Sequence, residues 1–137
     1  MRKILFRGVD EGGAWRHGFY VCLDEEIHAI YTGGAEHDCG ALYPVWYEVD
    51  PRTVGEYSGY KDSNGVRIFE GDVIKFRVGS LKTERRAVIE YKDGAFQARC
   101  GKTEVMLLSN VRNYSKGATE IIGNVHDAPG LLAEVLG

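Results

Sequence analysis

Apolar and polar residues alternate along much of this chain, and the alternation predicts β-strands joined by tight turns. In residues 15–23, Phe19, Val21 and Leu23 share one face of an extended segment. Further candidate strands before residue 52 cover residues 3–7, 27–32 and 43–49, with a glycine-containing loop over residues 33–40. Pro44 favours an edge position for the last of these strands, because proline donates no ladder hydrogen bond. We therefore predict an N-terminal β-hairpin or meander section over residues 1–52.

The alternation becomes more regular between residues 72 and 126, where it predicts five short strands. The pair Asp93-Gly94 predicts a two-residue hairpin turn between two of them. Five short strands bury a core and remove their edges by closing, so we predict a small SH3-like barrel. The chain is thus expected to be mostly β.

A short helix is predicted over residues 127–137, with Asp127 capping its first turn and Pro129 tolerated there. Its apolar residues recur at helical spacing and are Leu131, Leu132, Val135 and Leu136. They need a surface to pack on, which we expect to be the chain's own barrel, with a partner subunit as the alternative.

Residues 53–71 are a polar, turn-rich joint between the two β-regions. Four glycines and the pair Asn64-Gly65 favour turns with short strands between them. Asp62-Ser63-Asn64-Gly65 superficially resembles a calcium loop, but the ligand positions that should follow hold other residues. The four segments, 1–52, 53–71, 72–126 and 127–137, are compatible with one compact unit.

Composition narrows the function classes. The chain has 137 residues and a formal net charge of −3, which argues against a strongly basic nucleic-acid binder. Three cysteines at wide spacing indicate reduced thiols rather than a disulfide framework. The first apolar run is too short for a signal peptide, and no stretch has the length of a membrane span. We expect a cytoplasmic protein with no membrane partner.

Three ordered groups of residues resemble the YopX family of phage and prophage proteins over nearly the whole chain. They are Phe6-Arg7-Gly8 with Trp15 and Gly18-Phe19-Tyr20-Val21; residues 53–59, 61–65 and 70–74; and residues 120–129. The resemblance implies a mostly β protein from a family of uncharacterised function. It supplies no catalytic residues to carry over.

No catalytic, cofactor or metal site is predicted. Glu70 and Asp72 could pair as acid and base, but the intervening glycine is better explained by a turn in which Asp72 bonds nearby backbone. Potential metal ligands lack the paired spacing of zinc sites, and Cys39 has no activating neighbour; these ligands are His28, His37, Cys39 and His126.

The preferred function is a non-enzymatic interaction module that self-associates, with Tyr57 and Tyr60 as exposed contact residues and a phage or host protein as a further partner. The alternative is a nucleic-acid-associated protein that uses a basic barrel hairpin, made of Lys75, Arg77, Lys82, Arg85, Arg86 and Lys92. A weaker alternative is a small hydrolase or ligand-binding protein that uses Glu70 and Asp72.

Overall fold

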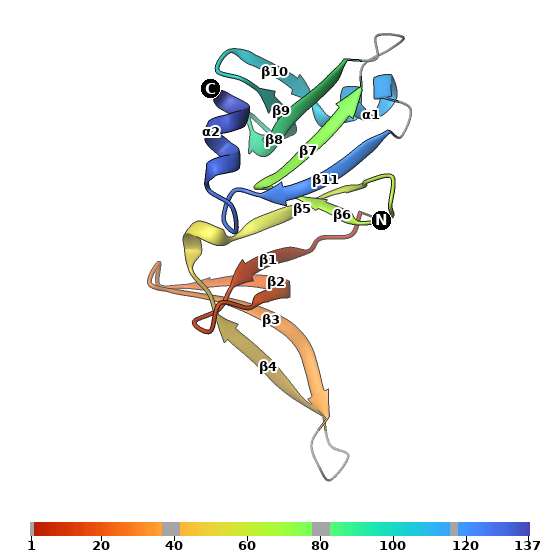
Figure 1. Cartoon of the computed structure of the whole chain (residues 1–137). Helices are drawn as coiled ribbons and strands as arrows, with labels where there is room; N and C mark the ends of the chain where they lie inside the picture. The colour runs from red at the N-terminus through yellow and green to blue at the C-terminus, as the bar shows by residue number, and fades with distance from the viewer. Residues whose placement is uncertain (1, 37–41, 78–82, 116–117) are drawn as a thin grey trace. The chain divides into compact units, whose positions relative to one another are not determined.

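The computed structural model of the chain describes residues 2–36, 42–77, 83–115 and 118–137 (Figure 1). It divides into two compact units, Met1–Tyr57 and Ser58–Gly137. The described residues are mostly β, as predicted, and form two antiparallel sheets. The division into four segments stays a prediction.

The first sheet has the strand order β4-β3-β2-β1-β5-β6. Its strands are β1 (Phe6–Val9), β2 (Trp15–Leu23), β3 (Ile27–Glu36), β4 (Leu42–Glu48), β5 (Gly55–Lys61) and β6 (Arg67–Phe69), and a short 3-10 turn, η1 (Pro51–Thr53), precedes β5. The hairpin strands β2 and β4 lie where the alternation predicts them. The predicted loop over residues 33–40 is partly wrong, because β3 continues to Glu36; residues 37–41 lie outside the described residues.

Strands β2 and β3 approach each other very closely at Gly18. A Cβ atom added there would lie 1.9 Å from the Tyr31 carbonyl oxygen and 2.8 Å from its carbonyl carbon. The obstacle is backbone, which cannot rotate aside as a side chain can. The absence of a side chain at Gly18 is therefore a condition for this pairing.

The second sheet has the order β10-β9-β8-β7-β11. Its strands are β7 (Asp72–Arg77), β8 (Glu84–Lys92), β9 (Ala95–Cys100), β10 (Glu104–Leu107) and β11 (Thr119–Asn124), and the helices of this unit are α1 (Leu108–Ser115) and α2 (Gly130–Leu136). All five predicted strands of this region are present. In the described residues they form no closed barrel, so the predicted SH3-like closure is not confirmed.

Both faces of the second sheet bury apolar side chains without closure. One face contributes Ile74, Phe76 and Ile89 to a cluster that also holds Leu108 and Val111 of α1. The opposite face packs Val73 and Val88 against the helix α2, described next. Because other elements cover each face, the sheet buries its core without joining its two edge strands.

Helix α2 docks on its own sheet, as predicted, through Val135. The predicted cap is wrong. The N-cap residue is Pro129, which makes no side-chain cap bond, while the Asp127 carboxylate accepts a hydrogen bond from Asn124 Nδ2 at 2.9 Å. Helix α1 was not predicted. Its sequence has two buried apolar residues among polar ones and a weak preference for helix, so the helix is stabilised mainly by packing on the sheet.

The turn-rich joint is organised by the buried carboxylate of Asp62. Its Oδ1 accepts hydrogen bonds from the amides of Asn64 and Val66, both at 2.9 Å, and its Oδ2 accepts one from Ile121 of β11 at 3.1 Å. The turn interpretation of this stretch is therefore confirmed at Asp62–Gly65, where the Gly65 amide also bonds the Asp62 carbonyl. One side chain shapes the turn and ties it to the neighbouring sheet.

Candidate interaction surface

Three aromatic side chains form a row across the first sheet. Phe19 of β2 pairs with Tyr31 of β3, and Tyr31 pairs with Trp46 of β4. Directly paired residues lie on the same face, so the rings stand side by side. Ring centroids are 6.5 Å apart between Phe19 and Tyr31 and 4.7 Å apart between Tyr31 and Trp46. We call these three residues the aromatic row.

The aromatic row is open to solvent. Phe19 is 61% exposed and Trp46 is 52% exposed. Leu23 and Ile27 pair with each other on the same face, at the β2–β3 turn, and are also exposed. Clustered exposed apolar side chains are uncommon on proteins that act alone and mark contact surfaces.

The opposite face of the same sheet is the packed one. Ile30 is fully buried there, and the ring of Tyr20 lies between those of Phe6 and His28, with centroid distances of 5.6 and 5.9 Å. The Tyr20 hydroxyl is hydrogen-bonded to His28 Nδ1, and burial raises the pKa of this tyrosine. The unit therefore buries one face of its strands and exposes aromatic rings on the other.

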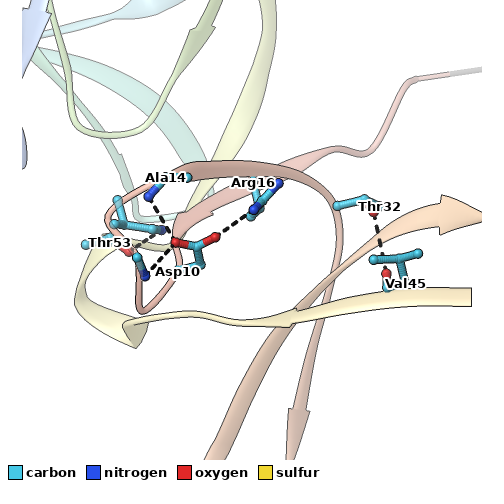
Figure 2. Close-up of polar contacts among 8 residues, drawn as sticks. Asp10, Ala14, Arg16, Thr32, Val45 and Thr53 are labelled. Carbon is cyan, nitrogen blue, oxygen red and sulfur yellow. Dashed lines mark hydrogen bonds and ion pairs between the residues drawn. The ribbon is translucent and has the colours of Figure 1, made fainter. Parts of the chain in front are cut away.

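The turn that joins β1 to β2 is organised by Asp10 (Figure 2). Its Oδ1 accepts hydrogen bonds from the amides of Gly12 and Ala14, both at 2.9 Å, and its Oδ2 pairs with Arg16 Nε at 2.7 Å. The Ala14 amide and the Arg16 guanidinium together hold the pKa of this carboxyl below its ordinary value. The Arg16 guanidinium in turn lies 3.7 Å from the centre of the Tyr47 ring.

A cleft of about 240 Å³ lies between this turn and strand β4. It is lined by Asp10, Glu11, Gly12, Trp46, Tyr47 and Glu48. Of its three carboxylates, Asp10 is already paired with Arg16, whereas Glu11 and Glu48 form no ion pair within the described part of the chain. Trp46 belongs to both this cleft and the aromatic row. We call this feature the Trp46 cleft.

The two predicted contact tyrosines lie elsewhere. Tyr57 is only 7% exposed, so the expectation that it is exposed is wrong. Tyr60 is half-buried, packs against the core of the second unit and has the Arg112 guanidinium 5.1 Å from its ring centre. Whether either contacts a partner stays a prediction. Alternation showed that Phe19 shares a face with Val21 and Leu23, but only the strand register brings Tyr31 and Trp46 beside it.

The predicted basic hairpin is divided between two faces of the second sheet. Lys75 pairs with Arg86 on one face, and Arg85 pairs with Phe76 on the other. Three of the five described cations have acidic partners: Lys75 lies 3.3 Å from Glu120, Arg85 bonds Glu104, and Arg86 lies 3.7 Å from Glu134. Arg77 and Lys92 are exposed, and no ion pair of theirs is found among the described residues; Lys82 lies outside that range.

Glu70 and Asp72 flank Gly71, whose φ is +88°. Asp72 is 2% exposed, and its Oδ2 accepts the Phe69 amide at 2.8 Å, so its bond to nearby backbone is as predicted. Across the described ranges, no three His, Cys, Asp or Glu side chains converge as a metal site would require. Of the candidate ligands, His28 is bonded to Tyr20, and His37 and Cys39 are not among the described residues.

No described helix is long and apolar enough to cross a membrane.

Comparisons with known proteins give a family and a fold. The family model described as YopX protein matches residues 7–133. Protein EF1440 from Enterococcus faecalis has a similar structure, with a TM-score of 0.65 and 24% identity over 96% of this chain and 99% of that one. Protein yopX from Bacillus subtilis is also similar, with a TM-score of 0.61 and 19% identity over 96% and 97% of the two chains. No curated protein matches the sequence.

Proposed function

The chain belongs to the YopX family, and we propose that it is a non-enzymatic interaction module that associates with further copies of itself through the aromatic row. The observation that carries the proposal is the exposure of Phe19 and Trp46 on either side of Tyr31. Rigid aromatic rings contribute much contact area at little cost in side-chain entropy, which is why they concentrate at protein interfaces.

A second copy suits this surface because the two units carry opposite charge. Residues 1–57 contain ten Asp and Glu against five Lys and Arg, whereas residues 58–137 contain ten against twelve. Two acidic first units would repel each other, so the favoured contact joins the first unit of one copy to the second unit of the next. Such a head-to-tail contact builds a ring where its rotation closes.

Sedimentation velocity and light scattering across a wide concentration range test the proposal. The wild-type protein should exceed the monomer mass, and a variant with Phe19→Ser and Trp46→Ser should be monomeric. Both side chains are largely exposed, so these changes should leave the fold stable within about 0.5 kcal/mol. Ile4→Ser is the control, because Ile4 is a 49% exposed apolar residue of the first unit outside the aromatic row. A wild type that stays monomeric at high concentration removes the proposal.

We also propose a cytoplasmic location, where thiols such as Cys22 and Cys100, both free here, stay reduced.

A nucleic-acid contact is the second candidate, and it rests on the exposed side chains of Arg77 and Lys92. Fluorescence anisotropy with labelled single-stranded and duplex oligonucleotides at low salt tests it, followed by a salt titration. Binding that weakens with salt and is lost in a variant with Arg77→Gln and Lys92→Gln would support this candidate. No change in anisotropy at low salt would end it.

A further inference from the structure

We propose that the Trp46 cleft receives the cationic side chain of an arginine or lysine from a second copy of the chain, and that this side chain anchors self-association. The inference rests on the proposed function and names the chemistry of the contact. The cleft, of about 240 Å³, is lined by the exposed indole ring of Trp46 and by three carboxylates. An aromatic face next to carboxylates is the environment that binds organic cations in proteins.

Among the described residues of the first unit, no ion pair balances the charge of Glu11 or Glu48 in the cleft. The guanidinium of Arg16 is held by Asp10, and that of Arg7 lies 4.6 Å from the Trp15 ring centre. Neither reaches Glu11 or Glu48 through an ion pair found in the described residues. Two carboxylates at the rim of one aromatic cleft therefore attract a cation from outside.

The other face of β4 already holds one arginine in this manner. Arg16 is paired with Asp10 at 2.7 Å and stacked 3.7 Å from the Tyr47 ring centre. Glu48 follows Trp46 by two residues on β4, so both side chains project from the same face of the strand. An incoming guanidinium stacked on Trp46 and paired with Glu48 would have the combination of contacts that Arg16 has on the other side of β4.

A second copy supplies suitable cations. Its second unit carries the excess of basic residues, and Arg77 and Lys92 are exposed there. Strand β4 is the last strand in the order of its sheet, so it has a pairing neighbour on one side, among the described strands. The aromatic row, continuous with the cleft through Trp46, would then supply the apolar part of the same contact.

Nuclear magnetic resonance with a short peptide probe tests the cleft directly. The probe is acetyl-Gly-Arg-Gly-amide, and its control is the citrulline peptide, which has nearly the same shape without the charge. The arginine peptide should shift the indole resonance of Trp46, assigned with Trp46→Phe, and the citrulline peptide should not. Glu11→Gln with Glu48→Gln should weaken binding about threefold to tenfold.

A matched charge control separates the cleft from general electrostatics. Glu25→Gln with Glu26→Gln removes the same charge from exposed positions of the same unit, outside the cleft. This control should bind the arginine peptide like the wild type and keep the wild-type mass. The Glu11→Gln and Glu48→Gln protein should dissociate at a higher protein concentration than the control, so that on dilution its mass falls towards the monomer first.

The two proposals fail in different ways. If the wild type self-associates while the arginine peptide leaves Trp46 unmoved, or binds no better than the citrulline peptide, the cleft inference is overturned and self-association stands. If the arginine peptide binds as expected but the wild type is monomeric, the second copy is excluded as the source of the cation and self-association fails.

Discussion

Replacing Gly18 with alanine should disrupt the pairing of β2 with β3. The backbone of Gly18 is ordinary extended strand, so alanine meets no conformational penalty there and only the available space matters. The added Cβ would lie 1.9 Å from the Tyr31 carbonyl oxygen. A carbon and a carbonyl oxygen approach to about 3.3 Å without repulsion, so one backbone must move by about 1.4 Å.

A movement of that size breaks more than one contact. It lengthens the ladder hydrogen bonds on either side of Gly18, each contributing about 1 kcal/mol, and displaces Tyr31 from the middle of the aromatic row. Overpacking in well-packed sites costs about 1–3 kcal/mol, and here the obstacle is backbone. We expect Gly18→Ala to lower the free energy of unfolding of the first unit by about 3 kcal/mol.

Urea unfolding followed by tryptophan fluorescence measures this loss. Both tryptophans of the chain, Trp15 and Trp46, belong to the first unit, so the signal reports on it alone. The midpoint should fall while the slope stays unchanged. Gly12→Ala is the matched control: its Cβ would lie 3.4 Å from Asp10 Oδ1, an ordinary contact, and the cost should be below about 0.5 kcal/mol. If Gly18→Ala unfolds at the wild-type midpoint, the close approach of the two strands does not exist in solution.

Three further results are expected. Asp62→Ala should lower the free energy of unfolding of the second unit by about 2–4 kcal/mol, because it leaves three backbone amides without their acceptor. Hydrogen exchange of the Ile121 amide measures this loss, and protection of that amide at the wild-type level would contradict the prediction. Iodoacetamide should modify the exposed Cys22 about tenfold faster than the buried Cys100, since burial raises the pKa of the Cys100 thiol. Peptide mass spectrometry measures both rates, and the difference between them should vanish when the protein is unfolded. The pKa of Asp10 is lowered in the folded state, so the stability that this carboxylate contributes is present above pH 3.8 and is lost as the pH falls from there through the folded pKa. The carboxyl carbon resonance of Asp10 should therefore titrate with a midpoint below pH 3.8, and a midpoint at or above that value would refute the pairing with Arg16.

Most strands of this protein could be predicted from the local alternation of apolar and polar residues. Alternation located β2 and the five strands of the second sheet, because successive side chains of an extended strand point to opposite faces and leave a period of two in the sequence. The turn at Asn64-Gly65 and the turn residue Asp72 were likewise predictable, since both depend on hydrogen bonds between residues close in sequence, whereas the organising role of the Asp62 carboxylate was not predicted. Helix α1 was not predictable, because its eight residues carry too few apolar positions to mark a helix without the sheet beneath them.

The aromatic row could not be predicted from the local sequence pattern. Phe19, Tyr31 and Trp46 are separated in sequence, and each by itself is an aromatic residue in a strand, which is as compatible with a core as with a surface. Their alignment follows from the register of three strands, and their exposure follows from which face of the sheet packed inward. Tyr57, by contrast, was predicted to be an exposed contact residue, and it is buried.

The amino-acid sequence determined the mostly β class and most strand and turn positions, because these depend on interactions between near neighbours in the chain. It also determined the resemblance to the YopX family, through ordered groups of residues along nearly the whole chain. The tertiary structure decided that the second sheet is open in the described residues, which face of the first sheet carries the aromatic row, and that Glu11, Trp46 and Glu48 line one cleft. Those features depend on strand register and on residues far apart in sequence, and a local pattern contains no information about either.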